Sequence, residues 1–413
     1  MTNTYFYIIL GILIGGFILE RWLAWLNMKN TKASVPEELK DVYEPERYLK
    51  SQEYKRINSR FSILTSSFSL LLILVMLLAG GFAILNDFAF SISSIYIFTA
   101  LLFFGILSFG SDLLSLPFDV YDTFVIEEKF GFNKTTTKTY ILDKIKGWLL
   151  GALIGGGIFA LIIWFYNLTG KNFWIWAWLL IAFFMIFMTM FYSNLIVPLF
   201  NKQTPLEKGD LRTAIEDFSQ KTGFKLNNVF VIDGSKRSTK ANAYFTGLGA
   251  KKRIVLYDTL INDLSTDEIV GVLAHEIGHY KKKHTLTGTF LSIVQMGITL
   301  FLFSLFLNNP GLSSALGVEE PNFHISMIAF GILYTPISMI LGYLFNLLSR
   351  KNEYQADRFA AENHDAKYLI SALKKLTSKN LSNLTPHPIY VKFYFSHPTL
   401  LERIRAMLPL VAV

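Results

Sequence analysis

Long apolar stretches constrain this chain more than any other feature. A bilayer crossing needs about 20 predominantly apolar residues. Seven stretches are long enough, at residues 4–26, 61–85, 95–116, 148–168, 173–197, 286–307 and 325–347. The composition agrees, because 52% of the 413 residues are hydrophobic and only 17% are charged, against about 25% charged in a typical soluble domain. The sequence therefore predicts an all-α polytopic membrane protein with seven transmembrane helices.

The distribution of Lys and Arg predicts how these helices are oriented. The segments 27–60 and 117–147 carry eight and five basic residues, whereas the loops 86–94 and 308–324 carry none. Because basic loops are retained on the cytoplasmic side, we expect the N-terminus outside or lumenal and the C-terminus cytoplasmic. The first stretch lacks the basic start and the cleavage site of a signal peptide, so we expect it to remain as an anchor. Both the endoplasmic reticulum and a bacterial inner membrane fit this pattern.

Charge and cysteine content exclude two classes of function. The net charge of +8 comes mainly from loops that flank membrane helices, and no basic patch alternates with aromatic residues as on a nucleic-acid surface. Because the chain has no cysteine, disulfides and thiol catalysis are excluded. We therefore expect the lipid bilayer as a partner, and no nucleic acid.

The order of the apolar stretches divides the chain into four portions. Residues 1–197 hold five membrane helices with their loops, and 198–285 form a cytoplasmic catalytic portion. Residues 286–348 hold the last two membrane helices, and 349–413 form a cytoplasmic C-terminal portion. The predicted topology places both polar portions on one side of the membrane, where they can share a site.

A helix with a metal-binding pattern lies at the end of the second portion. Ser265 followed by Glu268 has the spacing of a capping box, which predicts that a helix begins there. Within this helix His275 and His279 are four residues apart, so both imidazoles lie on one face and can bind one metal ion. Glu276 lies between them, where it can take a proton from an attacking water. This is the H-E-x-x-H spacing of zinc peptidases; a surface helix with two unrelated histidines is the alternative.

Two carboxylates at the start of the tail are candidates to complete this site. A catalytic zinc bound by two histidines needs a third protein ligand and an open position, and we expect Glu353 to be that ligand. Asp357 follows one helical turn later and is placed to accept a hydrogen bond from a ligating imidazole. The alternative is a solvated pair of carboxylates on a surface helix.

A histidine and an arginine near the C-terminus are further candidates for the site. His397 precedes a predicted helix that contains Arg403. His397 would donate to the oxyanion that forms on a peptide carbonyl, and Arg403 would support it or bind a substrate carboxylate; a helix-entry residue and a surface charge are the alternatives. The other histidines are expected to be structural: His284, His324, His364 and His387. We expect His284 to interact with the end of the metal-binding helix and His324 to lie on an outer loop.

Short patterns before the H-E-x-x-H helix predict a small α+β fold. Residues 211–222 favour a helix, and β-branched residues favour strands at Val229–Ile232 and Arg253–Tyr257. The stretch 242–247 is expected to be an edge strand beside the metal-binding helix, where an extended peptide can add by backbone hydrogen bonds; a structural hairpin is the alternative. The expected substrate-binding residues are Asn242, Ala243 and Tyr244. The glycines of the metal-binding helix, Gly271 and Gly278, would admit another backbone, as a site under a substrate strand requires.

Several motifs together resemble one known family. H-E-I-G-H, N-A-Y-F-T-G-L, E-Y-Q-A-D and S-H-P-T-L-L-E-R, with further stretches at 124–136, 198–202 and 233–238, are similar to the integral-membrane CaaX prenyl proteases. These are zinc metallopeptidases that process prenylated proteins such as yeast a-factor. The resemblance covers nearly the whole chain.

The resemblance implies seven helices around a large water-filled chamber, with a small gluzincin-like peptidase portion and one zinc near the cytoplasmic side. It implies His275, His279 and Glu353 as ligands and Glu276 as the catalytic base. It also supports the roles expected above for the residues outside the ligand set: Asn242, Asp357, His397 and Arg403. One departure is Lys240, which places a charge beside the expected substrate strand.

The expected function is zinc-dependent hydrolysis of peptide bonds near the C-terminus of prenylated CaaX proteins. The partner is then a peptide or protein substrate with a prenyl group. A broad-specificity protease for membrane quality control needs the same zinc site without prenyl specificity. A transporter or scaffold with a vestigial metal helix is the alternative from another class.

Overall fold

The computed structural model describes residues 3–32, 35–224, 229–247 and 253–411. The fold is mostly helical, with one small sheet. The long membrane helices are α1 (Thr4–Lys29), α2 (Pro45–Leu78), α4 (Tyr96–Tyr121), α7 (Gly156–Thr169), α8 (Phe173–Leu195), α13 (His284–Phe306) and α15 (Phe323–Asn363). Each of the seven predicted apolar stretches lies at least partly in one of these helices.

Two of the predicted crossings share one continuous apolar segment. By length and composition, six helical segments of the described chain can cross a membrane, and one of them runs over 64 residues, Thr137–Phe200. A turn, η5 (Gly170–Asn172), divides that segment, and α7 and α8 pack against each other on either side of it. At most 17% of any spanning window is buried within the protein, so these helices mainly face lipid or the space between them. The water-filled chamber stays a prediction.

The second predicted crossing, 61–85, has the wrong bounds. Helix α2 begins sixteen residues earlier, at Pro45, because a charged amphipathic segment continues the same helix outside the apolar stretch. The helix ends at Leu78, since Gly80 adopts a left-handed conformation with φ +70°, which glycine tolerates best. A separate short apolar helix, α3 (Gly81–Ile92), follows.

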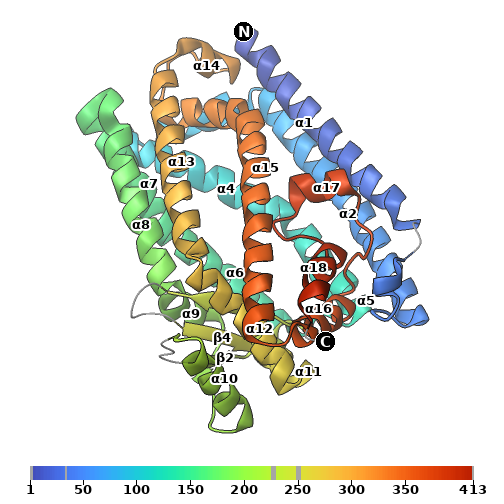
Figure 1. Cartoon of the computed structure of the whole chain (residues 1–413). Helices are drawn as coiled ribbons and strands as arrows, with labels where there is room; N and C mark the ends of the chain where they lie inside the picture. The colour runs from blue at the N-terminus through green and yellow to red at the C-terminus, as the bar shows by residue number, and fades with distance from the viewer. Residues whose placement is uncertain (1–2, 33–34, 225–228, 248–252, 412–413) are drawn as a thin grey trace.

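Shorter helices connect the long ones, and some of them form the polar end of the molecule. They are α5 (Glu128–Phe130), α6 (Thr137–Leu150), α9 (Val197–Phe200), α10 (Asp210–Lys221), α11 (Asp258–Asp263), α12 (Thr266–Lys281), α14 (Pro310–Ala315), α16 (Ala366–Lys379), α17 (Pro388–Tyr394) and α18 (Leu400–Met407). Two π-helical segments, η3 (Asp122–Glu127) and η4 (Gly151–Gly155), extend α4 and join α6 to α7. Figure 1 shows the sheet and α9 to α12 gathered at the end opposite α14. The N-terminus lies near α14, and the C-terminus lies at the other end.

The sheet has four strands in the order β1-β2-β4-β3. Strands β2 (Val229–Ile232) and β4 (Arg253–Tyr257) are parallel, and β1 (Gln203–Pro205) and β3 (Ala243–Thr246) pair antiparallel on the outside. The predicted strands are confirmed, and the prediction of an edge strand at 242–247 is confirmed for β3. Among the described residues its free edge has no strand partner, and β3 contacts α12.

Close backbone contact fixes α12 against the C-terminal helices. A Cβ built on Gly278 would lie 3.1 Å from the Ala356 backbone of α15, and one built on Gly271 would lie 3.0 Å from the Leu369 backbone of α16. The two glycines thus admit a neighbouring backbone, but the prediction of its identity was wrong. They bring α12 against two helices of the same chain, which leaves the substrate to another face.

Helix α15 is continuous from the membrane to the polar end. It runs from Phe323 to Asn363 and so crosses the division expected at residue 348. Its last turns pack on α12, and they carry Glu353 and Asp357. The rigid helix therefore fixes the tail carboxylates relative to both the membrane and the histidine helix.

Candidate metal centre

Helix α12 is held at its N-terminus by a capping box and an ion pair. The Glu268 carboxylate accepts from the Ser265 N–H at 2.8 Å, and Ser265 Oγ accepts from the Glu268 N–H, as predicted. Glu268 also accepts from Ser371 Oγ at 2.6 Å and from Lys375 Nζ at 2.8 Å, both on α16. Burial acts to raise the pKa of Glu268, but these hydrogen bonds hold it below the usual value. The helix is thereby fixed in direction before it presents its histidines.

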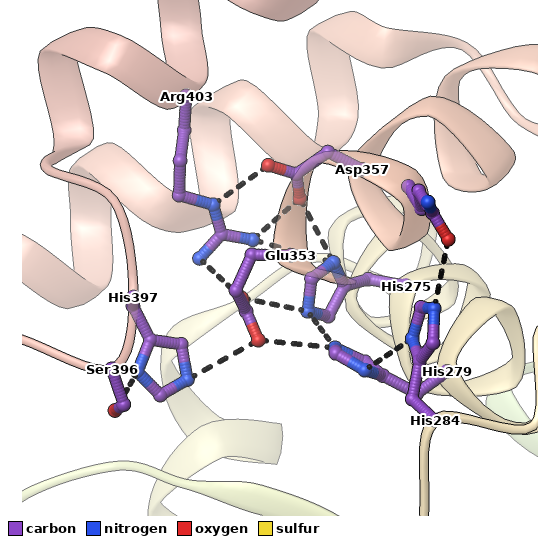
Figure 2. A network of polar contacts seen from close by, with 9 residues as sticks. His275, His279, His284, Glu353, Asp357, Ser396, His397 and Arg403 are labelled. Carbon is purple, nitrogen blue, oxygen red and sulfur yellow. Dashed lines mark hydrogen bonds and ion pairs between the residues drawn. The ribbon is translucent and has the colours of Figure 1, made fainter. Parts of the chain in front are cut away.

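His275, His279 and Glu353 converge in one group, as Figure 2 shows. Their candidate ligand atoms all lie within 4.8 Å of one another. His275 Nε2 is 3.4 Å from Glu353 Oε2, and His279 Nε2 is 3.2 Å from Glu353 Oε1. The two Nε2 atoms are 3.1 Å apart. Two helices that are distant in sequence, α12 and α15, therefore present two imidazole nitrogens and a carboxylate to one point.

This donor set fits a bound metal ion. Glu353 is 4% exposed, and its Oε2 atom has no hydrogen-bond partner although it is buried. A buried carboxylate oxygen without a hydrogen-bond partner is costly, and so are two imidazole nitrogens whose lone pairs face each other at 3.1 Å. A cation at their centre would satisfy all three groups. Two imidazoles and one carboxylate are a ligand set found in catalytic zinc peptidase sites.

Asp357 and Arg403 support His275, the first candidate ligand, at its second ring nitrogen. His275 Nδ1 lies 2.8 Å from Asp357 Oδ1, so the ring donates its second N–H to the carboxylate. Arg403 donates to both carboxylate oxygens, at 2.6 and 2.9 Å, and lies 3.7 Å from Glu353. Burial acts to lower the pKa of His275, but the nearby Asp357 and Glu353 carboxylates outweigh it and raise the pKa to about 9. The surroundings of His275 therefore favour positive charge.

Burial decides between the alternatives for these residues. Asp357 is 1% exposed and Arg403 is 8% exposed, so neither the solvated carboxylate pair nor the surface arginine describes them. Because the Arg403 guanidinium already donates to both oxygens of Asp357, the geometry favours a supporting role for Arg403 over a role in binding a substrate carboxylate.

The second ligand has an outer partner that the sequence reasoning missed. His284 Nδ1 lies 3.0 Å from His279 Nδ1, and His284 Nε2 lies 3.0 Å from Gln355 Oε1. Figure 2 shows the contact between His284 and His279 beside the ligand group. His284 was expected to interact with the end of its helix. Instead Lys283 adopts φ +60°, and this left-handed turn starts α13 in a direction that returns His284 to His279.

Two candidate catalytic side chains border the group. Glu276 is half-buried on α12, and among the described residues its carboxylate makes no hydrogen bond or ion pair. His397 lies in the loop before α18, with Nε2 3.5 Å from Glu353 Oε1 and 62% of its side chain exposed. Ser396 contacts its Nδ1 at 2.9 Å. His397 is therefore close to the ligand group and still accessible from solvent.

Comparisons with known proteins agree on one family. The family described as CAAX prenyl protease N-terminal, five membrane helices, matches residues 24–202, and peptidase family M48 matches residues 205–410. The chain belongs to the integral-membrane CAAX prenyl protease family. As a member of this family it is a multi-pass membrane metallopeptidase that acts on peptide or protein substrates.

Relatives and a solved structure cover almost the whole chain. CAAX prenyl protease 1 of Saccharomyces cerevisiae is 36% identical, with 97% of this chain and 94% of the relative covered. The homologue of Homo sapiens is 31% identical, with 96% and 95% covered. The crystal structure of S. mikatae Ste24p matches with a TM-score of 0.91 and 36% identity, over 98% of this chain and 99% of that one. The fold of the CAAX prenyl proteases therefore extends over nearly the full length.

Some side chains of the expected substrate strand are occupied by contacts within the protein. Asn242 is exposed, and its side-chain nitrogen donates to none of the described residues. Ala243 is half-buried in β3. The Tyr244 hydroxyl lies 3.3 Å from Ser193 Oγ of α8, so its side chain joins the sheet to a membrane helix.

The charge at Lys240 is paired inside the protein. Lys240 Nζ donates to Glu127 Oε2 of η3 at 2.6 Å and to the Tyr54 hydroxyl at 3.1 Å. It also lies over the Phe132 ring, 4.5 Å from its centre. The departure from the family pattern thus ties the loop before β3 to the membrane portion.

The other histidines take part in the fold. The placement of His324 on an outer loop was wrong: it lies in the first turn of α15, fully buried, with Nε2 2.9 Å from Asn86 Oδ1. His364 contacts the Asp267 carbonyl, and the side chain of His387 caps α17. For these three a structural role is consistent with the contacts.

Proposed function

We propose that this chain is a zinc-dependent endopeptidase that hydrolyses peptide bonds near the C-terminus of prenylated CaaX proteins. One Zn²⁺ per chain would be held by His275, His279 and Glu353. The observation that carries the proposal is the convergence of these three donors around a buried carboxylate oxygen that has no hydrogen-bond partner. Family membership supports it, and several relatives carry the name CAAX prenyl protease 1.

The side chains around the ligands have distinct roles in this proposal. When bound, zinc supplies Lewis-acid chemistry for the attacking water and the scissile carbonyl. Glu276 accepts the proton of that water and delivers it to the leaving amine; its lack of an ion pair supports this role. His397 donates to the developing oxyanion. Asp357, held by Arg403, orients His275, and His284 orients His279.

The substrate would lie extended along β3. Its free edge is beside α12, so a peptide backbone can add to the sheet near the metal centre. The exposed Asn242 amide would add a side-chain hydrogen bond, and Ala243 would present its backbone to the peptide at the free edge. Tyr244 would contribute through its side chain, because its backbone is in register with Val255 and faces β4. A prenyl group would lie among the apolar helices.

We also propose that the N-terminus is outside or lumenal and that the C-terminus is cytoplasmic. The opposite placement of the two chain ends supports this, as does the concentration of Lys and Arg in alternate loops. The catalytic portion 198–285, after the membrane portion 1–197, and the C-terminal portion 349–413, after the membrane portion 286–348, would then both face the cytoplasm.

The test is cleavage of a farnesylated CaaX peptide beside its unprenylated twin, in detergent, with wild type and Glu276→Gln. Cleavage of the farnesylated peptide only, lost in the variant while zinc content stays at one per chain, is the expected result. Cleavage of both peptides by wild type would instead support broad membrane quality control. An active Glu276→Gln variant would contradict the role of the base.

A transporter or scaffold is the proposal least supported by the site. Such a protein has no need of a complete ligand set with outer partners on both histidines. Purified protein that binds no zinc under any metal supply would favour it.

A further inference from the structure

A basic cavity lies at the polar end of the membrane helices, apart from the metal centre. Its volume is about 680 Å³. It is bordered by α6, by the end of α8 with α9, and by the sheet. Its lining includes the basic side chains Lys146, Lys202, Lys236 and Arg253 and the carboxylate Asp233. None of them belongs to the ligand group or its supporting residues.

Four of the lining side chains are basic, and their charge is not neutralised within the described part of the protein. Lys146, Lys202, Lys236 and Arg253 form no ion pair with any described carboxylate. Lys146 donates to the Leu199 carbonyl at 2.7 Å. Such a concentration of unpaired cations raises the free energy of the empty cavity and attracts an anion.

Three carboxylates of α4 and α6 are engaged with cations outside the cavity lining. Asp143 receives two hydrogen bonds from Arg237, at 2.7 and 2.9 Å. Lys144 pairs with Asp112 and Asp119 on α4. These three carboxylates therefore neutralise Arg237 and Lys144, and not the four cations of the cavity.

The one carboxylate in the lining, Asp233, does not neutralise the four cations. Its Oδ1 atom accepts from the Asn201 side chain at 3.0 Å and from the Lys202 backbone N–H at 2.8 Å. It closes the turn between α9 and β1. The formal charge of the lining is thus four positive and one negative, or +3.

The cavity also has an apolar side that continues into the membrane helices. Pro198, Leu199 and Phe200 belong to α9, which directly follows the membrane helix α8. Leu199 is 46% exposed. Across the cavity, Arg253 lies over the Phe230 ring, 4.4 Å from its centre. An occupant must therefore have an anionic group and an apolar body that extends towards the bilayer.

We propose that this cavity binds an anionic phospholipid, with the headgroup phosphate among the four basic side chains and the acyl chains along α8 and α9. Phosphate oxygens accept from Lys and Arg, and basic pockets between membrane helices bind acidic headgroups. Because β1, β2 and β4 line the cavity, the bound lipid attaches the sheet to the membrane surface. It does so without contact with the metal ligands.

The test uses the full-length protein, reconstituted in vesicles and re-extracted, with the retained lipids measured by native mass spectrometry. Vesicles contain phosphatidylglycerol and phosphatidylcholine in equal amounts. The variant is Lys202→Gln with Lys236→Gln, because both side chains are exposed and unpaired. The control is Lys134→Gln with Lys138→Gln, which removes the same charge from exposed positions in the loop before and the first turn of α6.

We expect wild type and control to retain phosphatidylglycerol in preference to phosphatidylcholine. Each basic residue near a membrane surface contributes roughly fivefold to acidic lipid binding, so the double variant should lose about 25-fold. Equal loss in the control would overturn the proposal, because it would indicate general charge attraction. Displacement of the lipid by an equal concentration of glycerol 1-phosphate would also overturn it, because that result identifies a site for free phosphate.

Discussion

The outer contacts of His279 predict how strongly the metal is held. An amide oxygen only accepts hydrogen bonds, so Gln355 Oε1, 3.0 Å from His284 Nε2, fixes the His284 proton on that nitrogen. His284 Nδ1 is then an acceptor for the His279 Nδ1–H, 3.0 Å away. This leaves the lone pair of His279 Nε2 free for a metal ion. The orientation of one glutamine amide thus sets the tautomers of two histidines.

The size of the effect follows from what each substitution removes. His284→Phe leaves the His279 N–H without its acceptor. Because the His279 side chain is only 21% exposed, water replaces that acceptor poorly. An unpaired buried donor costs about 1–3 kcal/mol, and loss of such an outer partner weakens metal binding about 10- to 100-fold. Gln355→Leu removes one neutral hydrogen bond and should cost about fivefold. Gln355→Glu keeps an acceptor and should retain affinity.

Competition with a chromophoric zinc chelator measures these affinities in purified full-length protein. His364→Phe is the matched control, because His364 ends α15 and contacts the Asp267 carbonyl away from the ligands. Thermal unfolding in detergent shows whether each variant is folded. Wild-type affinity in His284→Phe, or equal weakening in the Glu and Leu variants at position 355, would refute the reasoning.

Three further changes have expected outcomes. Asp357→Ala removes both carboxylate acceptors of the buried Arg403, whose remaining ion pair is the 3.7 Å contact with Glu353, and should lower stability by about 3–5 kcal/mol, seen as a lower melting temperature that Asp357→Asn partly restores. Gly278→Ala places a methyl group 3.1 Å from the Ala356 backbone and should cost about 1–3 kcal/mol by overpacking; an unchanged melting temperature would contradict that contact. The pKa of Glu268 is lowered in the native state, so its stabilisation is present above the unfolded value of about 4.3 and is lost as the pH falls through the native value. Below pH 5 the melting temperature should therefore decrease more steeply with falling pH in wild type than in Glu268→Gln.

Local sequence rules were enough for the first half of the metal centre. The i, i+4 spacing of His275 and His279 fixes both rings on one face of any α-helix, and the capping box fixes where that helix begins. The membrane crossings follow in the same way from the length of each apolar stretch. The bounds of α2 were less predictable, because a polar segment can continue a helix beyond the bilayer.

The remaining contacts depend on how distant segments pack. Gly271 and Gly278 indicate that a backbone comes close, but only the fold shows that it belongs to α15 and α16 and not to a substrate. Packing at Gly278 brings Glu353 to the two histidines.

The sequence by itself determined the membrane class, the metal-binding helix and the family, because these depend on short-range periodicity and on motifs. Only the tertiary structure decided that Arg403 is buried against Asp357 and that His284 returns to His279. The second of these depends on a left-handed turn at Lys283, a conformation that a lysine rarely adopts and that no local pattern predicts. Long-range packing selects such a turn, and it is therefore visible only in the folded protein.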